Sequence, residues 1–257
     1  MGSRGVLANL WTVLRVVGIA YLALLILAFL FQTRIVFPAG GSLWRTPASA
    51  GWGYEDLKIP VGRHVTHAWF IPAGQSRGVV LFSHGNAGTI ADRLESIEVF
   101  RDLGFDVLIY DYGGYGISTG RPSEKRCYED AQAMWKYLTE QRGVPREQIV
   151  AYGQSVGAGV AADLAAEKTP GAVILEGGFL SAVKLGQETF PFLPIGLLLR
   201  HRFPIDQKVA KITVPILLIH SSEDEIVPFS HAKALYALAN EPKTMDSLSP
   251  QRDIGRD

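Results

Sequence analysis

The stretch that decides the fold is QIVAYGQSVGAGVAADLAAEK, residues 148–168. The apolar run before Gly153 suits a buried strand, and the alanine-rich run after Ser155 suits a helix. Gly-x-Ser-x-Gly in this setting is typical of a nucleophile elbow, a sharp turn that exposes the serine oxygen. The glycines at 153 and 157 permit the turn and close packing of the helix. The sequence therefore predicts Ser155 as a nucleophile, the alternative being a tight turn whose serine only caps the helix.

The chain around this stretch alternates between short apolar runs and helix-like segments. The apolar runs are rich in Val, Ile and Leu and do not alternate in polarity, as expected for strands buried on both faces of a parallel sheet. They are VVLFSHG (79–85), DVLIYDY (106–112), QIVAYG (148–153), AVILEG (172–177) and PILLIH (215–220). Helical spacing follows at 91–104, at 123–143 and after Ser155. This order predicts right-handed crossovers and a doubly wound, mostly parallel α/β sheet.

The boundaries of the predicted α/β domain are residues 57 and 243. Residues 178–210 interrupt the alternation with three prolines and scattered apolar residues, which predicts a small cap over the site. Residues 34–56 contain the Gly- and Pro-rich PAGGSLWRTPASAGWG and are interpreted as a linker.

The amino terminus, residues 1–33, is predicted to be a membrane anchor. The run VVGIAYLALLILAFLF (16–31) carries no charge, and with its apolar extension it reaches the ~20 residues that cross a bilayer. No small-residue cleavage site follows, which favours an uncleaved signal anchor in a single-pass protein. Arginines on both sides leave the side of the membrane open. A buried core helix is the alternative.

Composition narrows the class of protein. A chain of 257 residues holds one large α/β domain. Lys plus Arg (25) equals Asp plus Glu (25), so charge does not indicate a nucleic-acid partner. Cys127 is the single cysteine and cannot form an internal disulfide, and no Cys/His cluster has the spacing of a zinc site. The oligomeric state stays open.

A second element, HGNAG (84–88), follows the strand-like run VVLFS. In hydrolases with a nucleophile elbow, the loop at this place supplies one backbone N–H to the oxyanion, and the residue after the nucleophile supplies the other. We expect these donors to be the N–H groups of Asn86, with Ala87 as the alternative, and Val156. His84 is expected to shape the loop and not to act as the base.

Four motifs in order carry a family resemblance: HGNAG, DYGGYGISTGRPSE (111–124), GQSVG and HSSEDEIVPFSHA (220–232). From about residue 34 to about residue 243 the chain resembles the membrane-anchored α/β-hydrolase-domain family related to serine aminopeptidases and prolyl oligopeptidases. The resemblance implies the α/β-hydrolase fold, a membrane segment, a Ser-His-Asp triad, and hydrolysis of acyl esters, thioesters or amides. Acyl transfer through a serine ester needs no metal or organic cofactor.

The resemblance places the triad acid on Asp224. This residue follows PILLIH, on a loop at the carboxyl edge of the sheet, where an acid can orient an imidazole. Glu176 is a weaker alternative at the end of the preceding strand. Glu223 and Glu225 are expected to point away.

The base of the triad has no counterpart in the expected place. In the family it lies on a loop after a final strand, but here residues 244–257 (TMDSLSPQRDIGRD) contain no histidine and few apolar residues. We therefore expect an irregular tail, a sheet that lacks its last strand, and an exposed PILLIH edge. Only weak candidates for the base remain among the six histidines, at 64, 67, 84, 201, 220 and 231. A truncation or shifted reading frame is preferred to an evolved pseudoenzyme.

These observations predict a membrane-anchored serine hydrolase whose activity is impaired because the catalytic histidine is missing. The apolar cap and the anchor favour acyl or lipid-like small-molecule substrates. Two alternatives remain: a non-catalytic α/β-hydrolase-fold binding protein, and a subunit that a partner chain completes.

Overall fold

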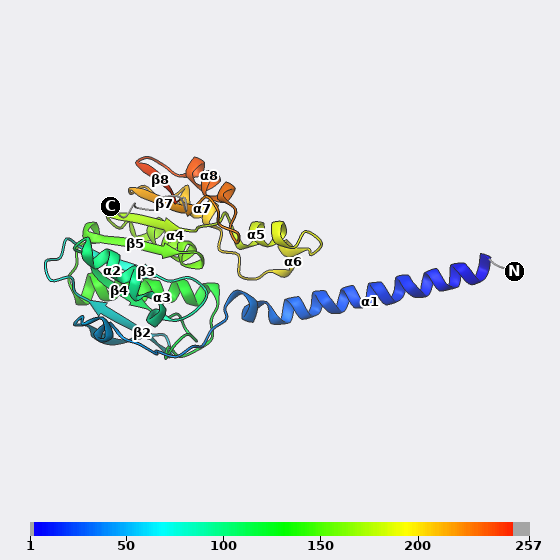
Figure 1. Ribbon diagram of the computed structural model, residues 1–257, viewed down its shortest axis with the longest axis horizontal. Helices are drawn as coiled ribbons and strands as arrows, with labels where there is room; N and C mark the ends of the chain where they lie inside the picture. The colour runs from blue at the N-terminus through cyan, green and yellow to red at the C-terminus, as the bar shows by residue number, and fades with distance from the viewer. Residues whose placement is uncertain (1–2, 249–257) are drawn as a thin grey trace, which may run out of the picture.

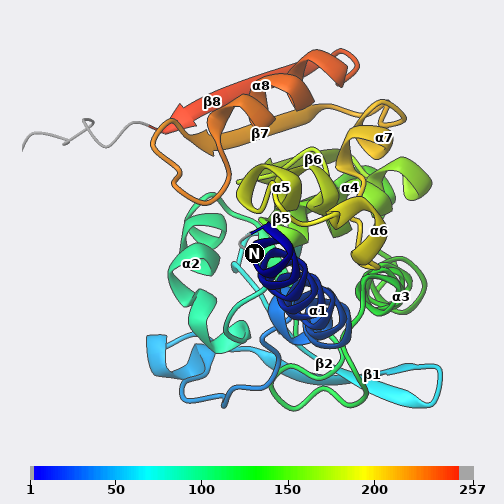
Figure 2. The same cartoon turned by 90° about the vertical axis from the view of Figure 1, so that its right-hand side faces the viewer.

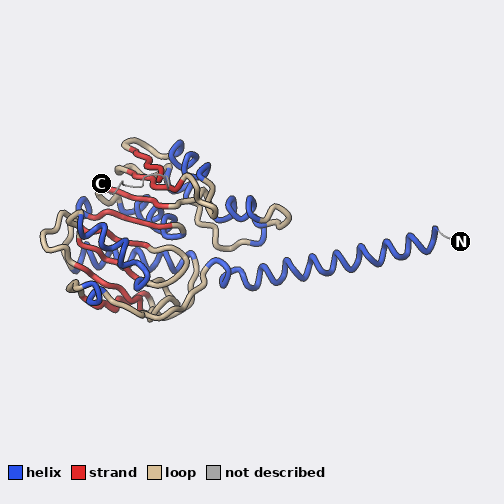
Figure 3. The backbone as a smooth tube through the Cα atoms, viewed as in Figure 1, coloured by secondary structure: helices blue, strands red, loops and turns tan. Residues whose placement is uncertain are grey.

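The body of the molecule is one eight-stranded sheet with helices beside it (Figure 1 and Figure 3). A computed structural model describes residues 3–248. The strand order is β1-β2-β4-β3-β5-β6-β7-β8. The strands are β1 (Glu55–Val61), β2 (His64–Ile71), β3 (Val79–Ser83), β4 (Asp106–Tyr110), β5 (Ile149–Gln154), β6 (Ala172–Glu176), β7 (Ile216–Ser221) and β8 (Lys243–Leu248).

The sheet is parallel except at its beginning. β1 pairs antiparallel with β2, and β2 pairs antiparallel with β4. All other neighbouring strands are parallel, including β3 on both of its sides. Every residue of β3 is buried, as its unbroken apolar run predicted. The five predicted parallel strands and the doubly wound α/β class are thus confirmed.

Helices cover both faces of the sheet. The sheet separates two hydrophobic cores, one on each face. One core contains Leu94 and Ile97 of α2, and the other contains apolar residues of α3, α4 and α8. The helices of the body are α2 (Leu94–Asp102), α3 (Glu124–Lys136), α4 (Val156–Lys168) and α8 (Phe229–Leu238). Short turns of helix are η1 (Pro47–Ala50), η2 (Ile90–Arg93), η3 (Tyr137–Gln141) and η4 (Arg146–Gln148). The first ten residues of α4 are buried, which explains why its sequence shows no polar face.

The carboxyl end of the described chain corrects one prediction. β8 (Lys243–Leu248) pairs in parallel with β7, from Ile216 opposite Lys243 to Ser221 opposite Leu248. The sheet therefore does not lack this strand, β7 is not an open edge, and residues 244–248 are not irregular. Met245 packs against the core while four of the other strand residues are exposed. An edge strand needs no continuous apolar run, so its polar residues gave no strand signal. The predicted tail beyond 248 lies outside the described residues.

The predicted cap lies between β6 and β7. It contains α5 (Ala182–Thr189), α6 (Ile195–Leu198) and α7 (Ile205–Val209). Ser181 caps the amino end of α5, where its side chain accepts a hydrogen bond from the N–H of Lys184 at 3.1 Å.

The amino-terminal helix α1 (Ser3–Val36) projects away from the body on the side of α5 and α6 (Figure 1). Figure 2 looks along this helix, with α5 and α6 beside it. Its segment Asn9–Val36 is long and apolar enough to cross a membrane, and side chains such as Ile19 are 69% exposed. α1 is therefore not the core helix considered as an alternative.

Candidate active site

Ser155 lies on a sharp turn between β5 and α4. Its backbone has φ 54° and ψ −117°, a strained combination for a residue with a side chain. The sharp turn requires glycine at the two neighbouring positions. A Cβ at Gly153 would overlap the carbonyl oxygen of Gly157, and a Cβ at Gly157 would overlap the carbonyl oxygen of Ser83. The Ser155 side chain makes no capping hydrogen bond to α4. The elbow therefore exposes a hydroxyl and does not simply cap a helix.

Two residues whose backbone N–H groups were predicted as oxyanion donors line the same cavity as Ser155. Val156 is the first residue of α4, and Asn86 lies in the loop after β3. Neither N–H donates a hydrogen bond within residues 3–248. The carbonyl of Asn86 is held by the Tyr115 hydroxyl at 2.7 Å, which fixes this loop. The structure thus brings together the residues predicted as nucleophile and oxyanion donors.

His84 supports the loop from inside the protein. Its ring is fully buried, with Nδ1 2.6 Å from the Gly85 carbonyl and Nε2 3.6 Å from Asp111 Oδ1. Burial lowers the pKa of His84 to about 4, so the ring is neutral at pH 7. Asp111 Oδ1 also accepts the Ile90 N–H at 3.0 Å. These contacts agree with the loop-shaping role expected for His84.

His67 lies on the other side of Asp111. Its Nδ1 is 4.0 Å from Asp111 Oδ2, and its Nε2 is 2.6 Å from Asp56 Oδ1. Burial disfavours the charged ring, but the carboxylates of Asp111 and Asp56 outweigh burial and raise the pKa of His67. His67 is therefore held between the carboxylates of Asp56 and Asp111.

Asp224 lies in the loop between β7 and α8. Its Oδ1 accepts hydrogen bonds from the N–H groups of Ile226 and Val227, both at 2.8 Å. Its Oδ2 is 3.7 Å from Nε2 of His220. Ile226 and Val227 line the cavity that contains Ser155, so Asp224 lies next to the cavity wall and shapes it.

The alternative acids lie elsewhere. Glu176 ends β6, where it accepts hydrogen bonds from the Tyr152 hydroxyl at 2.5 Å and from Gln154 Nε2 at 3.0 Å. Glu223 and Glu225 are exposed on either side of Asp224. The Glu176 carbonyl accepts the backbone N–H of Ser155 at 2.8 Å, but no hydrogen bond in the described chain joins the side chain of any of the three acids to Ser155.

The six histidines all lie within residues 3–248, and no hydrogen bond there joins any of them to Ser155. The histidine in the cap and the two histidines close in sequence to Asp224 form hydrogen bonds with other groups. These partners are the Val227 carbonyl for His220 (2.8 Å), Glu188 Oε2 for His231 (2.7 Å) and Thr33 Oγ1 for His201 (3.0 Å).

The cavity at Ser155 has a volume of about 710 Å³, and no charged residue among residues 3–248 lines it. The cap forms one wall and α1 forms another. The sequence did not predict that α1 lines the cavity, because a uniformly apolar helix has no polar and apolar sides that would indicate which side faces a neighbour. Gln32, which is 5% exposed, was the one available signal: a polar residue at the end of the apolar run.

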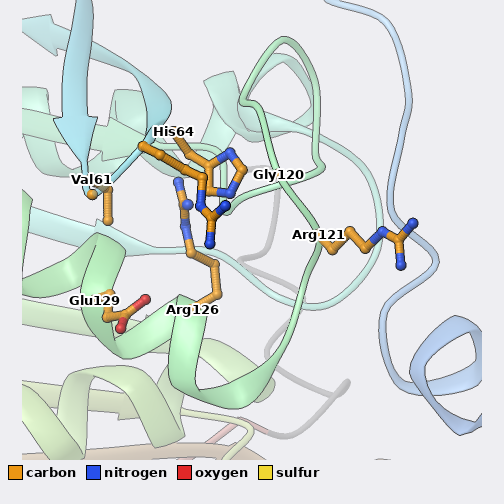
Figure 4. Close-up of a pocket in the computed structure, with 8 residues that line it drawn as sticks. Val61, His64, Gly120, Arg121, Arg126 and Glu129 are labelled. Atoms are coloured by element: carbon orange, nitrogen blue, oxygen red, sulfur yellow. The ribbon is translucent and has the colours of Figure 1, made fainter.

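A second cavity, of about 820 Å³, lies between the β1–β2 turn and the loop before α3 (Figure 4). Its lining includes Arg126, whose Nε donates to Asp130 Oδ1 at 2.8 Å, so this charge is already paired. Arg121 points away from the other labelled residues. Ser155 does not line this cavity.

A family described as serine aminopeptidase, S33, matches residues 74–199. An uncharacterized protein of Mycobacterium tuberculosis (strain H37Rv) is 34% identical over 224 residues, which cover 82% of this chain and 76% of that protein.

Two further similarities are consistent with this match. Alpha/beta hydrolase domain-containing protein 17C of Homo sapiens is 38% identical over 169 residues, 64% of this chain and 49% of that protein, so the match spans about half of that protein. The solved structure of an esterase from Pyrococcus furiosus superposes with a TM-score of 0.67 at 21% identity, covering 80% of this chain and 84% of the esterase. The chain therefore belongs to the α/β-hydrolase family.

Proposed function

We propose that this protein is a membrane-anchored serine hydrolase that acts on acyl esters, thioesters or amides. The observation that carries the proposal is the strained elbow of Ser155, whose hydroxyl shares an apolar cavity with the free N–H groups of Asn86 and Val156. Helix α1 is the proposed anchor, because its exposed apolar surface is long enough to cross a bilayer.

The proposed reaction begins with attack of Ser155 Oγ on the carbonyl carbon of the substrate. A C–O bond forms and the carbonyl π electrons move to oxygen, where the N–H groups of Val156 and Asn86 stabilise the charge. Collapse of this intermediate breaks the bond to the leaving group, which departs with a proton, and leaves an acyl-Ser155 ester. Water then hydrolyses the ester. In this proposal Asp224 orients whichever imidazolium forms beside Ser155.

The proton of Ser155 Oγ needs a base, and we propose that residues 1–257 do not supply one. Within residues 3–248, no hydrogen bond joins any of the six histidines to Ser155. In this chain by itself the base is therefore hydroxide or an added imidazole. Without a triad histidine, the oxyanion donors and binding still leave an acceleration of ~10³–10⁴ over water.

Fluorophosphonate labelling of the full chain in detergent micelles tests this function. The expected result is a slow adduct on Ser155, faster with added imidazole and absent in Ser155→Ala. A control variant, Ser181→Ala, should label like the parent chain because Ser181 caps α5 and does not line the cavity. Failure of Ser155 to react with or without imidazole would refute the hydrolase.

The same assay separates the alternatives. A non-catalytic binding protein is favoured by the lack of a histidine at Ser155, and it predicts tight ligand binding with no adduct. A subunit completed by another chain predicts labelling that depends on the added partner and not on imidazole.

A further inference from the structure

Helix α1 reaches the cavity that contains Ser155. Ser155, Val156 and Asn86 line this cavity. The rest of the lining is mostly apolar and comes from α1, the cap, and Ile226 and Val227 of the loop before α8. The contributions from α1 include Leu24, Leu27, Ala28, Phe31 and Ile35, and those from the cap include Leu185, Phe190 and Leu198.

Buried polar contacts hold α1 against the cap. Gln32 is almost completely buried, its Nε2 donates to the Leu198 carbonyl at 3.0 Å, and its Oε1 accepts the Arg200 N–H at 2.7 Å. Nearer the amino end, the Tyr21 hydroxyl donates to the Phe192 carbonyl at 2.7 Å. A buried amide is costly unless both of its ends are paired, so this pairing favours one position of α1.

The end of α1 also meets the oxyanion loop. The side-chain amide of Asn86 donates to the Val36 carbonyl at 3.2 Å, and Asn86 also lines the cavity. The anchor helix, the cap and the loop that is proposed to bind the oxyanion therefore converge on one apolar space. A chain that lies along α1 in the bilayer reaches Ser155 through this space without crossing water.

From this convergence we infer that α1 is a wall of the substrate pocket, and that the substrate is a membrane-held ester or thioester of a single long acyl chain. The inference rests on the proposed function. A volume of about 710 Å³ with no charged lining suits an alkyl chain and offers no counter-charge to an ionic head group. Each methylene added within the pocket should raise kcat/KM about fourfold, the factor that matches the ~0.8 kcal/mol of burying one methylene.

Two alanines of α1 give a matched pair of variants. Ala28 lines the cavity, whereas Ala23 is exposed and does not line it. Ala28→Trp should fill part of the pocket and leave the region next to Ser155 open. Ala23→Trp adds the same side chain elsewhere on the helix.

The test compares ethyl and hexadecyl fluorophosphonates on the full chain in micelles with added imidazole. We expect the ratio of long-chain to short-chain labelling rates to fall about tenfold or more in Ala28→Trp, because several buried methylenes are displaced, and to stay unchanged in Ala23→Trp. Equal ratios in the two variants would overturn the inference while leaving the hydrolase proposal intact.

A tether tests the pocket without any hydrolase chemistry. In Ser155→Cys, the thiolate attacks the sulfenyl sulfur of an alkyl methanethiosulfonate, so that an S–S bond forms and methanesulfinate leaves. Cys127 is buried and should not compete. The hexadecyl adduct should raise the Tm several degrees above the methyl adduct, a gain lost with Ala28→Trp and kept with Ala23→Trp. Equal Tm values for the two adducts would refute the pocket even if Ser155 proves unreactive in the parent chain.

Discussion

Replacing Gln32 by leucine should loosen the contact between α1 and the cap. The substitution keeps the size of the side chain close to the original but removes the two hydrogen bonds that the buried amide makes to the cap, to the Leu198 carbonyl and to the Arg200 N–H. Two backbone groups would then lack a partner. Each unpaired group costs ~1–3 kcal/mol when buried.

The geometry places this cost at the low end of that range. Leu198 is half-buried and Arg200 is exposed, so water can reach both backbone groups once α1 moves. We therefore expect Gln32→Leu to lower the free energy of opening this contact by about 2 kcal/mol, which corresponds to a ~30-fold larger equilibrium constant for opening.

Amide hydrogen exchange of the full chain in micelles measures this opening. The Arg200 N–H should exchange ~30-fold faster in Gln32→Leu, while amides of the central strand β5 stay protected. Gln207→Leu is the matched control, because Gln207 lies exposed on α7 in the same cap. Unchanged exchange at Arg200 would refute the view that Gln32 holds α1 in place.

Three further outcomes test other parts of the structure. Gly157→Ala should lower the Tm and abolish labelling of Ser155, because the new methyl overlaps the Ser83 carbonyl beneath the elbow; unchanged thermal melting would contradict this. Buried His84 stays neutral down to about pH 4, whereas the unfolded imidazole binds a proton near pH 6.5, so stability present above pH 6.5 should decrease by up to ~3 kcal/mol as pH falls toward 4. Urea unfolding across this range measures the slope, which a His84→Asn variant should reduce. Met245→Asp should destabilise the protein by ~2 kcal/mol because Met245 packs on the core, while Thr244→Asp, exposed on β8, should change stability by less than ~0.5 kcal/mol.

The central sheet and the elbow could be predicted because their local sequences are compatible with only one kind of structure. A strand buried on both faces must be apolar throughout, as β3 is, and a serine at φ 54° between two close backbones needs glycine on each side. These are local requirements, and a single sequence shows them directly.

The features that were missed depend on neighbours far away in the chain. β8 is an edge strand with exposed polar residues, and it is a strand only because β7 offers it a hydrogen-bonding edge. The side of α1 that lines the cavity differs in no local property from its other sides, apart from Gln32. Whether a histidine reaches Ser155 also depends on tertiary contacts, and in the structure His220 and His231 are hydrogen-bonded to other groups.

The pH dependence of Ser155 labelling by a fluorophosphonate, with and without imidazole, tests the central claim most directly. If Ser155 is a nucleophile without an internal base, the rate should rise in proportion to hydroxide through pH 7 with no plateau, and added imidazole should increase it with a plateau near the pKa of imidazole itself. A plateau near pH 7 without imidazole would show that a histidine of this chain takes the proton, and would contradict the account.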